Sequence, residues 1–131
     1  MSEIFEGPFP NYQPYIPATL SEIYDLLASL VGGAPTFVDE LFPLRTIDSE
    51  FGVLGASLDI VRGRLGEEGY AMAIDLAARA KTLFLEDQAE DNGKTDQGIK
   101  LLFEIENIIQ AARKGRAKAR IKDDEGRVTG D

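Results

Sequence analysis

Residues 50–65 carry the clearest periodic pattern in the chain, and its period is that of a packed helix. Apolar residues recur there at intervals of 3, 4, 3 and 4, as in a helix that packs along its length against another helix. They are Phe51, Leu54, Leu58, Val61 and Leu65. Packing within the chain is the simpler interpretation. The alternative is a seam between two copies of the chain, in which Phe51, Leu54 and Leu58 are interface residues.

Four other segments also show helical signals. The first begins at Thr19, where Glu22 completes a capping box, and it ends at a pair of glycines. Asp48 or Ser49 is expected to cap the helix at residues 50–65. The other three are a short helix at residues 35–43, an alanine-rich helix at 70–89 and a broadly apolar helix at 99–113.

No segment shows convincing strand alternation, although residues 119–128 favour at most a marginal hairpin. The sequence therefore predicts an all-α protein, a compact bundle of four to five helices. We expect an extended arm rich in proline and aromatic residues at 1–18, the helical bundle domain at 19–113, and a charged tail at 114–131.

The N-terminal arm combines four prolines with four aromatic residues between positions 5 and 17. Proline fixes φ and biases the preceding residue toward extended geometry, so this segment is predicted to be neither a helix nor a central strand. The arm is expected to lie over a groove between helices of its own domain. The alternative is contact with a neighbouring subunit or a partner protein, with Phe9, Tyr12 and Tyr15 as the interface residues.

The chain contains no histidine and no cysteine, which excludes many kinds of catalytic site. Histidine is the usual general base near neutral pH and the commonest metal ligand. Carboxylate chemistry with Mg²⁺ or Mn²⁺ remains, as does lysine, tyrosine or arginine chemistry. Neither a glycine-rich phosphate loop nor a nucleophile elbow is present. We therefore expect no catalytic residue, no metal and no cofactor.

Several features favour a cytoplasmic protein without membrane contact. No apolar run approaches the roughly 20 residues that a membrane span requires. The first residues lack the basic and apolar regions of a signal peptide. The absence of cysteine suits a reducing compartment.

An acidic cluster follows the alanine-rich segment and consists of Glu86, Asp87, Glu90 and Asp91. On a helix these residues form two pairs spaced i,i+4, so like charges would gather on one face and attract a basic partner or a divalent cation. The segment fails the EF-hand pattern, because Gln88 and Ile99 take the first and last ligand positions. A solvated acidic face is favoured over a catalytic site, and we expect this face to contact a protein partner.

A Mg²⁺-dependent carboxylate enzyme is a further alternative for this cluster. All-α nucleotide pyrophosphohydrolases use carboxylates on paired helices, and here Glu104 or Glu106 would face the cluster. Their EExxE and ExxD arrangement is not met, because Glu67 and Glu68 lead into Gly69 and no ExxD follows on a later helix.

A basic stretch stands out in a chain whose net charge is -9. Its six cationic residues are Arg113, Lys114, Arg116, Lys118, Arg120 and Lys122. A structural role is favoured, either as a complement to the helix dipole or docked on the acidic body of the same chain. Contact with an acidic protein or a neighbouring subunit comes next. Nucleic acid is the least favoured partner, because the body is acidic and the stretch has no aromatic residue to stack on bases.

Together these features favour a small acidic protein-binding module that masks a basic surface of a macromolecular partner. Inhibitors, immunity-type proteins and regulatory adaptors act in this way, and electrostatic complementarity would speed their association. A self-assembling structural protein is the first alternative, and the Mg²⁺-dependent enzyme is the second.

Overall fold

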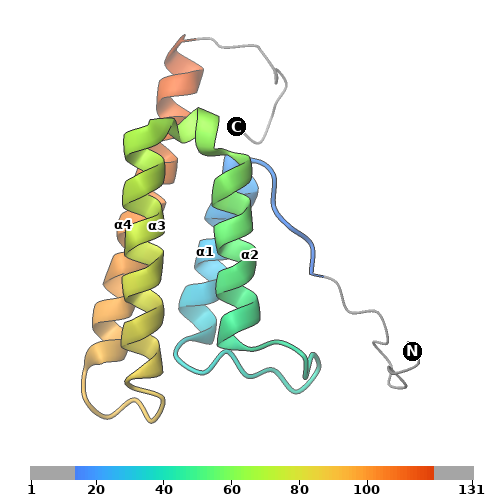
Figure 1. Cartoon of the computed structure of the whole chain (residues 1–131), viewed down its shortest axis with the longest axis vertical. Helices are drawn as coiled ribbons and strands as arrows, with labels where there is room; N and C mark the ends of the chain where they lie inside the picture. The colour runs from blue at the N-terminus through green and yellow to red at the C-terminus, as the bar shows by residue number, and fades with distance from the viewer. Residues whose placement is uncertain (1–13, 120–131) are drawn as a thin grey trace.

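The protein is a bundle of four helices in a computed structural model that describes residues 14–119. The helices are α1 (Leu20–Gly33), α2 (Ile47–Ile60), α3 (Arg62–Leu85) and α4 (Lys94–Ala119). They run alternately down and up the bundle, and α4 continues past the other three (Figure 1). Helix α3 packs against α2 and α4, while α1 packs against α4 and, less extensively, α2. The described residues contain no strand, which confirms the predicted all-α bundle.

Short-range capping signals start the first two helices. The hydroxyl of Thr19 accepts a hydrogen bond from the backbone N–H of Glu22 at 3.1 Å, so the expected cap of α1 is confirmed. Helix α2 begins earlier than predicted. Its cap is Thr46, and Ser49 completes a reciprocal capping box with it at 3.0 and 2.9 Å. Ser49 therefore takes part from the third helical position, and neither it nor Asp48 is the cap itself.

Residues 50–65 do not form one helix. Helix α2 ends at Ile60, and α3 starts at Arg62 and bends at Gly66, whose φ of 81° is readily adopted only by glycine. Two contacts span the bend, because the Arg62 guanidinium before it binds the Glu67 carboxylate at 2.8 Å and stacks on the ring of Tyr70, both of which follow it. The chain thus reverses direction within the predicted helix, and the main part of α3 returns alongside α2.

The predicted short helix at residues 35–43 is wrong. Residues 34–46 form an irregular loop between α1 and α2, hereafter the α1–α2 loop. Phe37 has a φ of 59°, in the left-handed region that a right-handed helix does not contain. The peptide bond between Ala34 and Pro35 is cis.

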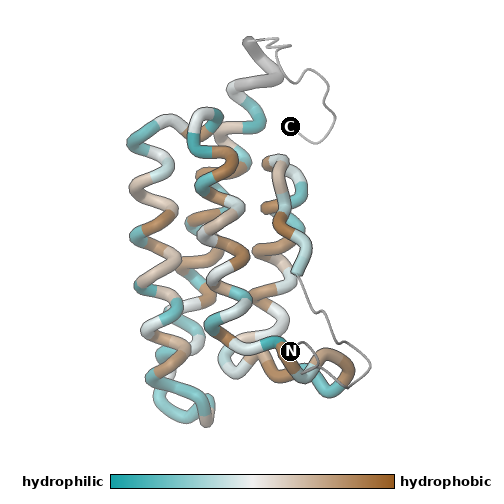
Figure 2. The backbone as a smooth tube through the Cα atoms, turned by 45° about the vertical axis from the view of Figure 1, so that its right-hand side comes forward, coloured by the Kyte–Doolittle hydropathy of each residue, from teal (hydrophilic) through white to brown (hydrophobic). Residues whose placement is uncertain are grey.

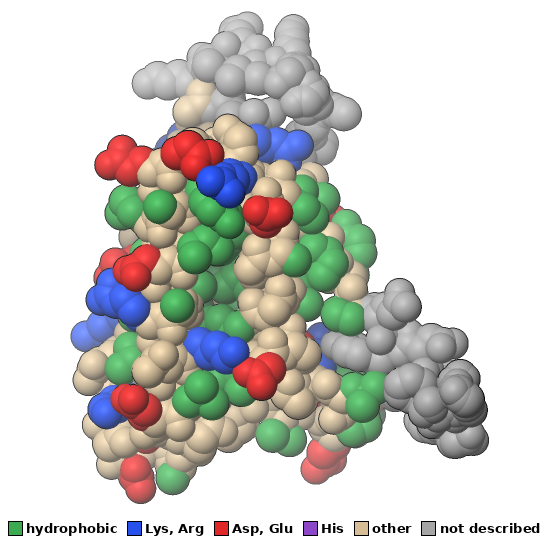
Figure 3. Space-filling view, viewed as in Figure 1, with side chains coloured by type: hydrophobic (Ala, Val, Ile, Leu, Met, Phe, Trp, Pro, Cys, Tyr) green, Lys and Arg blue, Asp and Glu red, His purple; other side chains and the backbone are tan. Residues whose placement is uncertain are grey.

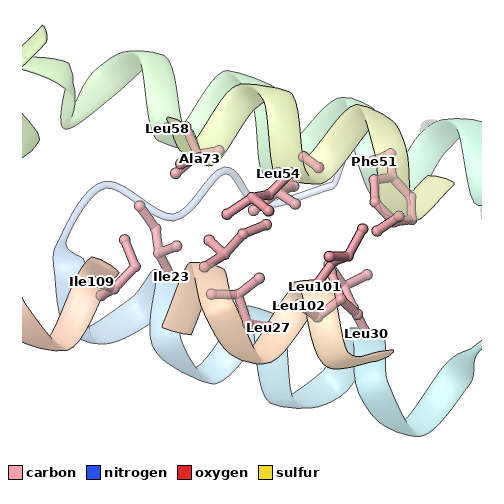
Figure 4. Close-up of a cluster of buried hydrophobic side chains, with 14 of the residues drawn as sticks. Ile23, Leu27, Leu30, Phe51, Leu54, Leu58, Ala73, Leu101, Leu102 and Ile109 are labelled. Atoms are coloured by element: carbon pink, nitrogen blue, oxygen red, sulfur yellow. The ribbon is translucent and has the colours of Figure 1, made fainter. Parts of the chain in front are cut away.

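The hydrophobic core lies between the four helices (Figure 4). Every helix contributes apolar side chains that are almost completely shielded from solvent, and Figure 4 shows them meeting along the bundle axis. Phe51, Leu54 and Leu58, proposed above as interface residues, are among them. These three residues of the heptad seam are therefore used within the chain and are not available to a second copy.

Helices α3 and α4 are in close contact at Gly98. A Cβ atom at this position would lie 2.6 Å from Cε1 of Phe84, whose ring is fully buried and cannot move aside. We expect Gly98→Ala to destabilise the protein by about 1–3 kcal/mol, despite the higher helix propensity of alanine, because the core would be overpacked. Urea unfolding followed by circular dichroism would measure this loss.

Gly115→Ala is the matched control, because among the described residues no atom beyond its chain neighbours and its own helix backbone lies within 4 Å of the added Cβ. Alanine there should leave the stability unchanged or raise it by up to about 1 kcal/mol. Equal effects of the two substitutions would contradict the close approach at Gly98.

The two ends of the chain are described only in part. Residues 14–18 lead into α1, and Tyr15 is exposed, whereas Phe9 and Tyr12 lie outside the described residues. Helix α4 extends to Ala119, beyond the predicted end at residue 113. Arg120, Lys122 and most of the suggested hairpin lie outside the described range. Within that range, none of the helices combines the length and apolar character needed to cross a bilayer.

Candidate functional site

Two loops meet at one end of the bundle, the end drawn at the bottom in Figure 1. They are the α1–α2 loop at residues 34–46 and the α3–α4 loop at residues 86–93, and together they form what we call the loop end. The Gln88 side chain connects them. Its amide nitrogen donates to the backbone carbonyl oxygen of Pro35 at 2.7 Å and to that of Phe84 at 2.8 Å.

The α1–α2 loop exposes an unusual number of apolar side chains. Nine large hydrophobic residues are exposed in the described part of the chain, and four of them lie within residues 38–44. They are Val38, Leu41, Phe42 and Leu44. Val38 and Leu41 are the most open, at 77 % and 73 % exposure. Apolar residues recur along this loop in Figure 2, and hydrophobic side chains reach the surface at the lower right of Figure 3. Clustered exposure of this kind is typical of binding surfaces.

Phe37 anchors this loop in the core. Its side chain is only 5 % exposed, and its ring makes edge contacts with Phe51 and Phe84 at centroid distances of 5.8 and 5.7 Å. A left-handed φ is unfavourable for a bulky residue, so burial of the ring must offset that cost. With Phe37 turned inward, the chain turns Val38 outward.

Side-chain hydrogen bonds fix the rest of the loop. The Asp39 carboxylate accepts from the backbone N–H of Leu41 at 2.9 Å and pairs with the Arg45 guanidinium at 3.4 Å. The same guanidinium lies over the ring of Phe42, 5.1 Å from its centroid. The backbone N–H of Arg45 donates to the carbonyl of Phe42 at 3.0 Å. The exposed apolar side chains are therefore held on an ordered backbone.

The predicted acidic face does not form as expected, because α3 ends at Leu85 and residues 86–89 are turns. Glu86 pairs with Lys94 at 2.9 Å. Glu90 and Asp91 are exposed, and Glu90 has a positive φ of 55°. The i,i+4 spacing assumed for these carboxylates requires a helix that the chain has already left.

Asp87 is buried at 2 % exposure and is not part of any acidic surface. Its carboxylate accepts three backbone N–H groups, those of Asp91, Asn92 and Thr95, at 2.8, 3.2 and 2.9 Å. Thr95 is in the first turn of α4, so Asp87 caps that helix from the preceding loop. Burial alone would raise the pKa of Asp87, but hydrogen bonds led by those from Thr95 lower it below the usual aspartate value.

The loop end nevertheless carries excess negative charge. Its two loops contain six acids, counted from residues 34–46 and 86–93, against the single base Arg45. Glu40, Glu90 and Asp91 are exposed. The loop end therefore carries both exposed apolar side chains and excess negative charge.

The carboxylates proposed for a Mg²⁺ site do not converge. Within residues 14–119, no three acidic side chains come together in an arrangement that could hold a metal ion. Asp87 already accepts the three backbone bonds above. Glu104 lies ten residues beyond the start of α4, roughly 15 Å along the helix axis, and Glu106 lies further still.

The basic stretch begins at the opposite end of the bundle from the loop end (Figure 1). Arg113 donates to the side chain of Gln110 at 3.0 Å, and Lys114 is exposed. Arg116 and Lys118 follow within α4. Arg113 is nineteen residues from the start of α4, or roughly 28 Å, which exceeds the screening length of about 8 Å at physiological salt. The stretch therefore begins too far from the acids of residues 86–91 for direct pairing.

Comparison with protein-family models, curated proteins and solved structures finds no match to this chain. The site is therefore interpreted from its own geometry.

Sequence reasoning missed the apolar residues of the α1–α2 loop as a surface. Phe37, Val38, Leu41 and Phe42 have helical spacing, which favours an amphipathic turn with all four facing inward. The prolines at 35 and 43, which set the bounds of the predicted helix, leave room for only about two helical turns, and so short a helix is marginal without tertiary support.

Proposed function

We propose that the chain is a protein-binding module whose contact surface is the loop end. The observation that carries this proposal is the outward presentation of Val38 and Leu41 on a loop anchored by Phe37. Exposing two large apolar side chains on an ordered backbone gives no benefit to folding. It does favour binding, since little conformational entropy is lost when the partner docks.

The charge around this surface indicates the chemistry of the partner. Glu40, exposed next to Leu41 in the sequence, would lie at the rim of a contact centred on Val38 and Leu41, while exposed Glu90 and Asp91 add negative charge on the neighbouring α3–α4 loop. A complementary partner presents an apolar depression bordered by lysine or arginine. Apolar contact would supply affinity, while the charged rim would speed association and discriminate against acidic proteins. Such masking of a basic surface is how an inhibitor, an immunity-type protein or a regulatory adaptor would act.

Self-assembly through the heptad seam lacks the support it had from sequence, because Phe51, Leu54 and Leu58 fill the core of their own domain. The loop end is acidic in every copy, so two loop ends would also repel each other. A different protein is therefore the better partner.

Photocrosslinking would test the loop end directly. A photoreactive phenylalanine analogue replaces Leu41 in the full-length chain, expressed in the cells from which the gene comes, and adducts are identified by mass spectrometry. We expect one dominant protein adduct at position 41 and none at Phe103, a half-exposed aromatic position on α4. Adducts at 103 but not at 41 would reject the loop end as the contact surface.

The partner identified in this way allows a quantitative test. Leu41→Ala should weaken its binding at least tenfold, as expected for an apolar residue near the centre of an interface. Phe103→Ala is the control and should leave the affinity within about twofold. Glu40→Gln should mainly slow association, and this effect should shrink as salt is raised.

A further inference from the structure

A pocket of about 260 Å³ opens beside the α1–α2 loop, between residues 14–15, α1 and α2. Its apolar walls come from Pro14, Tyr15, Leu26, Phe42 and Val53. The ion pair between Arg45 and Glu50, with 3.6 Å between Nε and Oε2, forms the remaining wall. The pocket lies where α1 and α2 contact each other, which is the least extensive contact between neighbouring helices.

The chain that precedes Pro14 joins the bundle at this pocket. Residues 15–18 are held against the bundle by a carboxylate on α1. The Tyr15 hydroxyl donates to Oε2 of Glu22 at 2.9 Å, and the backbone N–H of Ala18 donates to Oε1 at 3.0 Å. The Arg64 guanidinium donates to the carbonyl of Ala18 at 3.0 Å. These bonds fix the point at which residues 1–13 are attached.

Residues 1–13 have a composition that matches the pocket. They contain the aromatic residues Phe5, Phe9 and Tyr12, together with two prolines. Tyr12 is two residues from Pro14, and Phe9 is five residues from it, a reach of at most roughly 17 Å. Tethering at the pocket's edge gives these rings an effective concentration that a free partner rarely attains.

We propose that residues 1–13 occupy this pocket in the same chain and insert the ring of Phe9 or Tyr12 between Phe42 and Val53. The segment then covers the α1–α2 groove and supports the loop from the side of Phe42. Its two acids, Glu3 and Glu6, do not complement the acidic loop end. The contact is therefore apolar and insensitive to salt. It is independent of whether the loop end binds a partner.

Nuclear Overhauser effects on the full-length chain test this contact. The chain is deuterated, with labelled Leu and Val methyl groups and protonated Phe and Tyr rings. We expect the methyl groups of Val53 and Leu26 to show contacts to an aromatic ring, and we expect these contacts to be lost in either Phe9→Ala or Tyr12→Ala. Contacts to Tyr15 and Phe42 alone would overturn the proposal. The control is a mixture of two samples, one with labelled methyl groups only and one with protonated rings only. No contact is expected in the mixture if the ring and the methyl groups belong to the same chain. A contact in the mixture would assign the ring to a second copy and overturn the proposal.

A double-mutant cycle gives an independent measurement. Phe9→Ala with Tyr12→Ala should raise the equilibrium constant for unfolding at least tenfold in urea. In a chain that already carries Phe42→Ala, the same two substitutions should raise the unfolding constant by a factor at least threefold smaller, because one wall of the pocket is then missing. Phe103→Ala, which is outside the pocket, should leave the increase unchanged. Equal increases in all three backgrounds would overturn the proposal.

Discussion

Phe37→Ala is expected to destabilise the protein by about 3–5 kcal/mol, one of the largest losses from any single substitution in the chain. The ring is almost fully buried and contacts two other core aromatics, Phe51 and Phe84. Its removal leaves a cavity between α2, α3 and the α1–α2 loop. Urea unfolding followed by circular dichroism would measure the loss.

Phe37→Gly separates the role of the backbone from that of the ring. At a φ of 59°, alanine retains a cost of about 1–2 kcal/mol that glycine does not have. We therefore expect Phe37→Gly to be at least as stable as Phe37→Ala. Substitution of Phe103, inside α4, by alanine and by glycine should give the opposite order, with the glycine variant about 1 kcal/mol less stable than the alanine variant. The same order at both sites would contradict the left-handed backbone at Phe37.

The anchoring of Phe37 also connects the fold to the proposed function. If the loop is held in its binding conformation by this ring, both variants should weaken partner binding, although Phe37 itself is not exposed. At temperatures where the variants remain folded, the loss of binding affinity should exceed what their small unfolded fraction explains. This dependence follows from pre-organisation, because a released loop must be ordered again when the partner binds.

The helices could be predicted from sequence because their signals are local. The Thr19 cap and the heptad spacing each lie within one or two turns, and both correspond to features of the structure. Sequence could not decide whether the heptad seam is internal. That depends on whether the chain turns back after Val61, and the bend at Gly66 brings α3 alongside α2.

The candidate site could not be predicted, because its determinants are distant in sequence. Phe37 faces inward since Phe51 and Phe84 provide a place for its ring, and Phe84 comes 47 residues later. The hydrogen bond from Gln88 to Pro35 joins residues 53 positions apart. Helical spacing at residues 37–42 is a weak local signal, and these tertiary contacts override it.

Asp87 shows the same limit at shorter range. As one of four acids in a run, it has the sequence character of a surface residue. Its partner Thr95 is eight residues away, across a turn that contains Asn92 and Gly93. The Asn92 side chain defines that turn. Its amide nitrogen donates to the backbone carbonyl of Glu86, and its amide oxygen accepts from the backbone N–H of Lys94. The carboxylate is thereby buried while its neighbours remain exposed.

Asp87→Asn is expected to lower the melting temperature by roughly 5–10 °C at neutral pH. The variant replaces one carboxylate oxygen with an NH₂ group. If that group takes the place of Oδ2, it faces the backbone N–H of Thr95, so two donors oppose each other, and the negative charge at the start of α4 is lost. Asp91→Asn is the matched control, because Asp91 is exposed and contributes its backbone N–H to the same turn. It should change the melting temperature by no more than about 2 °C.

The stability difference between the natural chain and Asp87→Asn should depend on pH with a defined sign. The pKa of Asp87 in the folded state is lower than the ordinary value, so its contribution is fully present above the unfolded pKa of about 3.9. The contribution is lost as the pH falls through the lower, folded pKa, where the carboxylate becomes protonated. Melting curves from pH 7 to pH 3 should therefore show a constant difference above about pH 5 and a shrinking one below pH 4. A difference that grows on acidification would show that burial of the charge outweighs its three hydrogen bonds.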